Sequence, residues 1–119
     1  ITLVGQVINV PGGSDNGMVM DFSDVKTLAK THVVDAWDHA FLVWREDYDV
    51  ARFLATLPNH KTVVMDTVPT AENLARRAFS ILDPIYHSKF GNHIRLERIR
   101  LFETPNCWAD ALREEGIEF

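Results

Sequence analysis

Pro69-Thr70-Ala71-Glu72-Asn73 opens the clearest helix of the sequence, and the neighbouring segments are best interpreted outward from it. Thr70 is a favoured N-cap residue, and Glu72 places an anion near the positive end of the helix dipole. An apolar stripe at helical spacing follows, made of Ala71, Leu74, Ala75, Ala78 and Leu82. Because proline interrupts a helix interior, Asp83-Pro84 predicts its end, with a polar connection over Tyr86–His93.

The segment 94–103 after this helix has the composition of a long strand. Its apolar positions change parity midway, from Ile94 and Leu96 to Ile99 and Leu101. Such a switch predicts a β-bulge or a strand covered on different sides along its length. Glu103 shares the parity of the second pair, so we expect its carboxylate on the covered side, where it needs a donor. A solvent-facing glutamate at the strand end is the equally open alternative.

The other segments follow ordinary signals for strands, helices and turns. Strands are predicted at Ile1–Val10, Thr62–Met65 and Cys107–Leu112, a turn at Pro11–Gly17 and a short apolar return at Met18–Met20. One helix is predicted after a cap at Asp21 or Ser23, with Phe22, Val25, Leu28, Ala29 and His32 or Val33 on its apolar side. Another is predicted within Arg45–Leu57, capped by Asp47, with Val50, Phe53, Leu54 and Leu57 on one side. This order predicts an α+β fold with an antiparallel sheet and helices on one face.

Composition limits the class of protein further. A chain of 119 residues with 46% hydrophobic residues predicts a single domain, 1–119, with a real core. The formal net charge of -5 argues against a nucleic-acid surface, and no apolar run approaches the roughly 20 residues of a membrane span. Cys107 is the one cysteine, which excludes an intrachain disulfide and a CxxC metal site and fits a reducing, cytoplasmic setting.

The candidate catalytic pair is Asp38-His39, which lies inside the apolar run Trp37–Trp44. Histidine gives and takes protons near neutral pH, and an adjacent carboxylate can hold its tautomer and stabilise its cation. A structural alternative also fits: a helix end or turn in which Asp38 caps backbone amides and His39 fills space. By contrast, His60 lies in a polar turn and is expected to be solvated.

Four segments in order carry a family resemblance: Gly17-Met18-Val19-Met20-Asp21-Phe22, Asp38-His39, Pro69-Thr70-Ala71-Glu72-Asn73 and Glu103-Thr104-Pro105. Over nearly its whole length the chain resembles the 6-pyruvoyltetrahydropterin synthase and 6-carboxytetrahydropterin synthase family. The resemblance implies the tunnelling fold, a four-stranded antiparallel sheet with two main helices on one face. It also implies subunits that join their sheets into a barrel, usually as a homohexamer of two stacked trimers.

The same resemblance implies a lyase activity on 7,8-dihydroneopterin triphosphate. Family members eliminate triphosphate, and the carboxy-type enzymes also release acetaldehyde on the way to 7-deazaguanine and queuosine. Asp38 and His39 match the proton-relay pair of the family. Glu103 matches the glutamate that anchors the pterin, and Thr70 falls where the family lines the pterin pocket.

The zinc site of the family has no counterpart in this sequence. The family holds zinc with three histidines and places its catalytic cysteine just before a His-x-His, whereas Ile1–Gly5 corresponds to the strand just past those residues. We therefore expect the family's first strand, the zinc ligands and that cysteine to lie upstream of Ile1. Three functions stay open: a zinc-dependent carboxytetrahydropterin synthase, a pyruvoyl-forming member, and a non-catalytic pterin-binding subunit without zinc.

Overall fold

The structure is a computed structural model that describes residues 1–5, 21–92 and 94–113. The expected turn at Pro11–Gly17 and the return at Met18–Met20 lie outside these residues, as does the second half of the first expected strand. The elements in order are β1 (Thr2–Gly5), α1 (Phe22–Ala29), the π-helix η1 (Lys30–Val34), α2 (Asp35–Trp37), β2 (Ala40–Trp44), α3 (Tyr48–Ala55), β3 (Lys61–Met65), α4 (Ala71–Phe90), β4 (Ile94–Thr104) and β5 (Cys107–Leu112).

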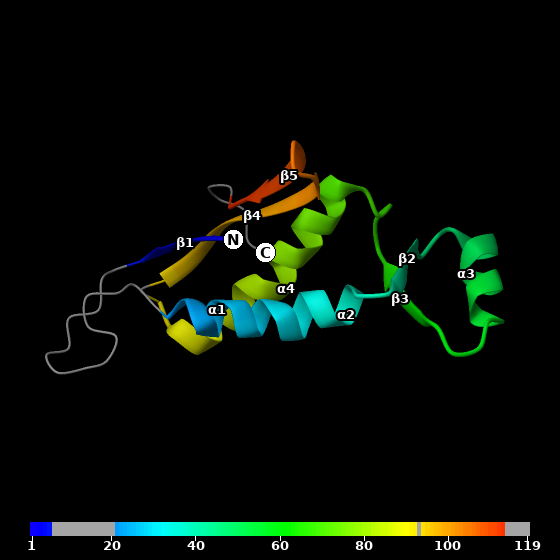
Figure 1. Ribbon diagram of the computed structural model, residues 1–119, viewed down its shortest axis with the longest axis horizontal. Helices are drawn as coiled ribbons and strands as arrows, with labels where there is room; N and C mark the ends of the chain where they lie inside the picture. Colours follow the sequence, from blue (N-terminus) through cyan, green and yellow to red (C-terminus); the bar gives the residue numbers. More distant parts are fainter. Residues whose placement is uncertain (6–20, 93, 114–119) are drawn as a thin grey trace, which may run out of the picture.

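The main layer is an antiparallel sheet in the order β1-β4-β5, with β4 in the centre. Helix α4 and the continuous helical run α1–η1–α2 lie together on one face of this sheet (Figure 1). The α+β class with an antiparallel sheet and two main helices on one face is therefore confirmed. The helices of the described segments are all too short or too polar to cross a membrane.

The core lies between this sheet and its helices. Its largest fully buried side chains are Phe79, Leu82, Tyr86 and Leu96. Residues from α1, α4, β4 and β5 complete it: Val25, Ala75, Ala78, Ile94, Ile99 and Ala111. The apolar stripe read from the α4 sequence thus faces the sheet, as its helical spacing predicts.

The parity switch in β4 is a bulge. Neighbouring residues Thr2 and Leu3 of β1 pair with Arg98 and Leu96 of β4, so Glu97 is the additional residue. The buried side of β4 changes at this point, from Ile94 and Leu96 to Ile99. The bulge predicted from the sequence is therefore confirmed, because an inserted residue moves all later side chains to the opposite face.

The predicted end of α4 at Asp83-Pro84 is wrong, because the helix continues to Phe90 with Pro84 inside it. An interior proline costs about 3 kcal/mol. The turn beyond it buries Tyr86, whose hydroxyl donates to the Val25 carbonyl at 3.0 Å and whose ring stacks on Phe90. Burial of one large apolar side chain contributes roughly 1.5–3 kcal/mol, so this turn offsets the proline.

A second, two-stranded sheet pairs β2 and β3 in parallel, with Ala40 opposite Lys61 and Trp44 opposite Met65. The sequence interpretation has no strand at β2 and no parallel pair. Helix α3 connects the two strands, as parallel pairing requires a crossover. This small unit projects from the main body beyond the end of α2 (Figure 1).

Several residues differ from their predicted surroundings. Phe22, Val50, Phe53 and Leu57 are exposed rather than packed, and Asp47 precedes α3 without a side-chain cap bond. His60 is not simply solvated: it is half-buried, its Nε2 lies 2.7 Å from the Leu54 carbonyl, and its ring meets Phe41 edge-on.

The predicted cap of α1 is present. Asp21 accepts from the Ser23 amide at 2.9 Å.

Candidate functional site

Glu103 lies at a second bulge, where β4 turns into β5. Phe102 pairs with Trp108 and Thr104 with Cys107, so Glu103 is the additional residue. The bulge breaks the alternation that placed Glu103 on the covered side, and the residue is exposed, which corrects that expectation in favour of the solvent-facing alternative.

The carboxylate of Glu103 has one close partner in the described part of the structure. The thiol of Cys107 donates to its Oε2, with 3.6 Å between sulfur and oxygen. The bond and the negative charge of Glu103, with a smaller contribution from Glu72, hold the pKa of Cys107 above its ordinary value. The sequence interpretation gave Cys107 no role, although the tight turn between two strands could have placed it opposite Thr104.

Thr70 and Glu72 belong to the same end of the molecule. Helix α4 begins beside the β4–β5 turn (Figure 1), which explains why the Glu72 charge reaches Cys107. The Thr70 side chain accepts from the Asn73 amide at 3.2 Å, so Thr70 is the predicted N-cap. A hydroxyl that accepts one bond can still donate its proton, and Thr70 is exposed. This end therefore offers a carboxylate acceptor and a hydroxyl donor.

Asp38 and His39 form the turn between α2 and β2. The backbone leaves the helix at Asp38, and His39 has the left-handed φ of 54°. Their side chains are 65% and 94% exposed, with 3.8 Å between His39 Nε2 and Asp38 Oδ1. The turn predicted by the structural alternative is present, but His39 fills no space in this chain. An accessible acid–imidazole pair can exchange protons with a bound molecule.

The structure groups the predicted residues into two sets rather than one. Glu103 and Thr70 lie at the β4–β5 turn and the start of α4, whereas Asp38 and His39 lie at the junction of α2 with the small sheet (Figure 1). Within the described ranges, no hydrogen bond or ion pair connects the two sets. A site that uses all four residues needs a bound molecule, or a second copy of the chain, to connect them.

The expected zinc site can be tested on the side chains present. In residues 1–5, 21–92 and 94–113, no three His, Cys, Asp or Glu side chains come together as metal ligands. The described residues therefore do not fit a zinc ion.

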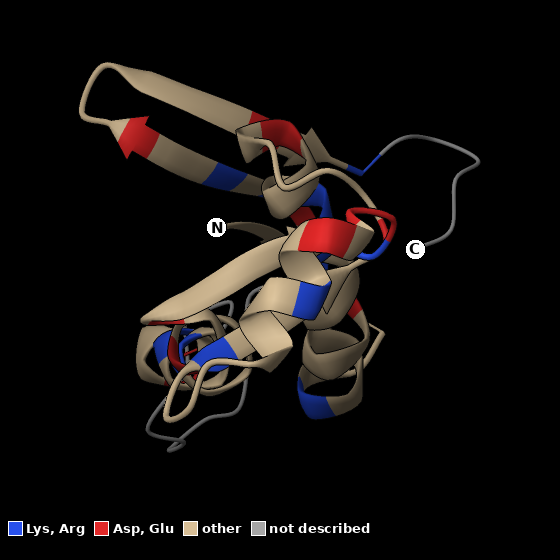
Figure 2. Cartoon of the chain, turned by 90° about the vertical axis from the view of Figure 1, so that its right-hand side faces the viewer, with Lys and Arg blue, Asp and Glu red and all other residues tan. Residues whose placement is uncertain are grey.

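The sheet face opposite the helices carries polar and aromatic side chains to which the sequence interpretation gave no function. Arg100 forms two bonds to Asp110, of 2.8 and 3.0 Å, and its guanidinium lies 4.7 Å from the Trp108 ring centre. The bond from Arg100 lowers the pKa of Asp110. Phe102 packs against Trp108 on the same face. In the view of Figure 2, acidic and basic residues both occur and form no single basic face.

A cavity of about 340 Å³ lies elsewhere, beside the second half of α4. Its lining includes Asp83, His87, Arg95 and Arg113. Arg113 pairs with Asp83 and also donates to the Leu96 carbonyl at 2.8 Å, while Arg95 pairs with Glu97. Among the described lining residues, the two arginines and the carboxylate of Asp83 are therefore already paired.

Comparison with known proteins agrees with the resemblance seen in the sequence. Residues 2–114 match the family described as 6-pyruvoyl tetrahydropterin synthase. A 6-carboxy-5,6,7,8-tetrahydropterin synthase of Rickettsia felis is 30% identical over 95 residues, covering 79% of this chain and 67% of that protein. The protein of the same name from Haemophilus influenzae is 34% identical over 101 residues, covering 82% of this chain and 67% of that protein. No solved structure gives a significant match.

The antiparallel sheet with two main helices on one face is the arrangement of the tunnelling-fold class. Together with the match over residues 2–114, it shows that the chain belongs to the 6-pyruvoyl tetrahydropterin synthase family.

Proposed function

We propose that this protein is a 6-carboxy-5,6,7,8-tetrahydropterin synthase-type lyase. Its substrate is 7,8-dihydroneopterin triphosphate, which loses triphosphate and acetaldehyde in a cytoplasmic route toward 7-deazaguanine and queuosine. The names of the relatives from Rickettsia felis and Haemophilus influenzae support this product. The observation that carries the proposal is the exposed Glu103 carboxylate at the β4 bulge, beside the start of α4.

Glu103 is the proposed pterin anchor. A carboxylate can accept two parallel bonds, here from the exocyclic amine and the adjacent ring N–H, and such charge-assisted pairs are strong. Cys107 contacts Oε2 alone, so Oε1 is open to a ligand and Oε2 retains further acceptor capacity. Thr70 would bind a polar atom at the rim of the pterin through its free hydroxyl proton.

Asp38 and His39 are the proposed proton-transfer pair. The exposed imidazole can take a proton from the substrate side chain and return it, and the carboxylate 3.8 Å away stabilises the cation that forms. Because these residues stand apart from Glu103, we propose that the site forms between copies of the chain in a homo-oligomer, in the hexamer implied by the family.

Zinc is part of the proposal only through the family resemblance. Bound zinc would polarise hydroxyl groups of the substrate. Its ligands would be residues other than those described, and metal analysis of the native protein tests this directly. About one zinc per protomer is expected, and a metal-free active enzyme would contradict the requirement.

An assay of the reaction products separates the proposal from two alternatives. A pyruvoyl-forming enzyme would release triphosphate without acetaldehyde, so an acetaldehyde assay of the product mixture separates it from the carboxy type. A non-catalytic subunit would bind the pterin and release neither product.

The anchor is tested by pterin binding to Glu103→Gln. The amide retains one carbonyl oxygen and adds a donor, so one of the two bonds becomes donor against donor. Loss of a polar partner costs about 1–3 kcal/mol. We therefore expect the dissociation constant for neopterin, measured by calorimetry, to rise roughly tenfold to hundredfold. Glu46→Gln, in the exposed turn after β2, is the matched control and is expected to bind as the parent does. Equal binding by Glu103→Gln in a folded protein would remove Glu103 from the site.

A further inference from the structure

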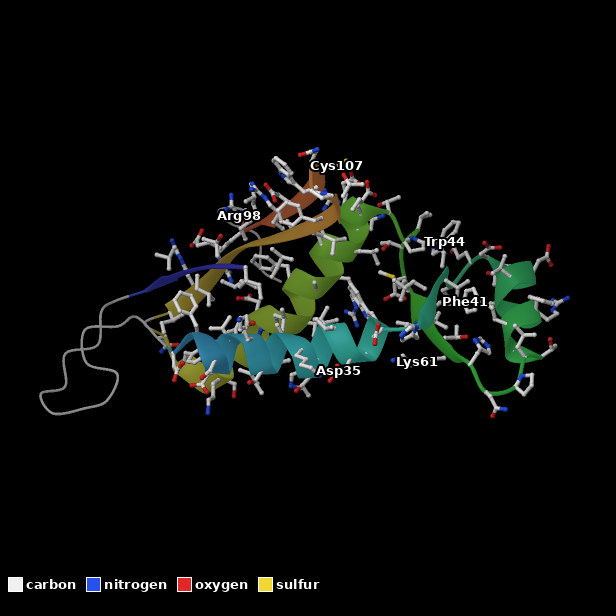
Figure 3. The ribbon with its side chains drawn as sticks, in the orientation of Figure 1. Asp35, Phe41, Trp44, Lys61, Arg98 and Cys107 are labelled. Atoms are coloured by element: carbon white, nitrogen blue, oxygen red, sulfur yellow. The ribbon has the colours of Figure 1, made fainter. Side chains whose placement is uncertain are left out.

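We propose that Lys61 is a positioning residue for the Asp38-His39 pair, because it fixes the backbone on both sides of the pair. This inference rests on the proposed function, in which His39 transfers a proton. Figure 3 shows Asp35 and Lys61 at the junction between α2 and the small sheet. The two residues are 26 positions apart in sequence.

The first contact lies before the pair. In a helix that continued, the Asp35 carbonyl would accept from the His39 amide four residues later. The helix instead ends at Trp37, which leaves this carbonyl among the orphan acceptors of a helix C-terminus. Lys61 Nζ donates to it at 2.6 Å. The donor is charged, and such bonds are shorter and stronger than neutral ones.

The second contact lies directly after the pair. Ala40, the residue that follows His39, is opposite Lys61 in the parallel pairing of β2 with β3. The backbone of Lys61 therefore fixes the chain after His39, and its side chain fixes the chain before Asp38. Lys61 thus contacts the chain on both sides of Asp38-His39.

The side chain of Asp35 has a second lysine partner, Lys30, in the helix before the pair. Lys30 Nζ bonds to both carboxylate oxygens of Asp35, at 2.9 and 3.1 Å. In an α-helix, residues five apart lie about 140° apart around the axis and do not meet. The π-helical turn Lys30–Val34 brings them to one side. Lys30 thus orients the Asp35 side chain and Lys61 binds its carbonyl. Local π-turns occur frequently at functional sites.

His39 needs such support. A left-handed φ in a residue other than glycine costs on the order of 1–2 kcal/mol and persists only where the surroundings impose it. The imidazole is 94% exposed, so side-chain packing does not impose it. The conformation must therefore be held through the backbone, and the Lys61 contacts on both sides supply that constraint.

The experiment compares Lys61→Met, which keeps the aliphatic stem and removes the donor, with Lys61→Arg, which restores a charged donor. Lys26→Met is the matched control, since Lys26 is an exposed lysine of α1 whose side chain has no partner in the described structure. Lys30→Met is a milder second variant because it removes only the exposed ion pair to Asp35. Amide hydrogen exchange is read at Asp38, whose N–H bonds to the Val34 carbonyl at 2.8 Å, and at Phe79 in the core.

For Lys61→Met we expect about tenfold faster exchange at Asp38 with unchanged exchange at Phe79. We also expect kcat to fall about tenfold while KM stays within about twofold, because misplacement of a proton-transfer group affects the chemical step. Lys61→Arg is expected to restore both quantities, Lys30→Met to change both in the same direction by less, and Lys26→Met to change neither.

Two results would overturn the inference. Unchanged Asp38 exchange, with or without a loss of activity, would show that Lys61 does not fix the dipeptide. Faster exchange with normal kcat would show that the constraint has no catalytic role. Faster exchange at Phe79 would mean global destabilisation, and the decision then rests on whether Lys30→Met changes Asp38 alone. A parent protein without lyase activity would refute the proposed function separately, since Asp38 exchange still reports the positioning.

Discussion

The hydroxyl of Tyr86 donates to the backbone carbonyl of Val25 across 61 positions of sequence, at 3.0 Å and within the core. This bond attaches the second half of α4 to α1, and it lies in the helical turn that follows Pro84. The attachment explains why the helix continues where its sequence predicts an end.

Tyr86→Phe tests the energy of this bond. The substitution keeps the ring and removes the donor, leaving a buried carbonyl with one bond fewer, so we expect a loss of about 1 kcal/mol in the free energy of unfolding. Urea denaturation measures it. Tyr48→Phe is the control. Because Tyr48 is 67% exposed, loss of its hydroxyl is expected to leave the free energy of unfolding unchanged. Equal stability of Tyr86→Phe and the parent would contradict the attachment.

The same residue predicts a pH dependence. Burial raises the pKa of Tyr86 from 10.0 to about 12. Between these values the unfolded chain releases the phenolic proton and the folded protein retains it. The contribution of Tyr86 is therefore complete below pH 10 and is lost as the pH rises to about 12, with a slope of up to about 1.4 kcal/mol per pH unit. The difference in stability between the parent and Tyr86→Phe isolates this slope, and a difference that is constant with pH would disprove it.

Cys107 reports the state of Glu103. The carboxylate accepts the thiol proton and raises the pKa of Cys107, so the thiolate is scarce at neutral pH. Glu103→Gln removes the charge, and we expect faster alkylation by iodoacetamide at pH 8, by several-fold, because the thiolate is the nucleophile. Asp110→Asn is the control for a general change of charge, because Asp110 lies on β5 with Cys107. A rate that Glu103→Gln leaves unaltered would show that the two side chains do not interact in solution.

His39→Ala and Asp38→Asn test the proton-transfer role of the pair. General acid–base groups contribute about 10²–10⁴-fold to rate, so His39→Ala is expected to lower kcat by that order with a smaller effect on KM. Asp38→Asn is expected to lower it less, since the imidazole remains without its stabilising charge. His32→Ala is a suitable control, because His32 is an exposed histidine on the preceding helical run. Normal turnover in folded His39→Ala would reduce the pair to a structural turn.

The proposed assembly can be tested through shared sites. In the described part, β1 and β5 are the edges of the main sheet, and unpaired edges favour pairing with another chain. Light scattering is expected to show a hexamer. If the site combines His39 of one copy with Glu103 of another, mixed oligomers of His39→Ala and Glu103→Gln would regain about one quarter of parent activity. A stable monomer at micromolar concentration, or no regain in mixed oligomers, would argue against shared sites.

The sequence by itself determined the features that depend on neighbours along the chain. Thr70 caps α4 because a hydroxyl three residues before Asn73 can accept its amide. The parity switch of the β4 apolar residues predicts a bulge or a change of the covered side, and the α+β class follows from the order of such segments. Side-chain size, branching and spacing are sufficient for these, since helix caps and strand alternation are local geometry.

Only the tertiary structure decided what depends on residues far apart in sequence. Pro84 remains inside α4 because the Tyr86 hydroxyl donates to the Val25 carbonyl. Glu103 is exposed because pairing with β5 makes it a bulge residue. Lys61 reaches Asp35 because β2 and β3 are parallel. In the first two cases burial or strand register overruled a local signal, and in the third the hydrogen bond comes from a partner that no local pattern specifies.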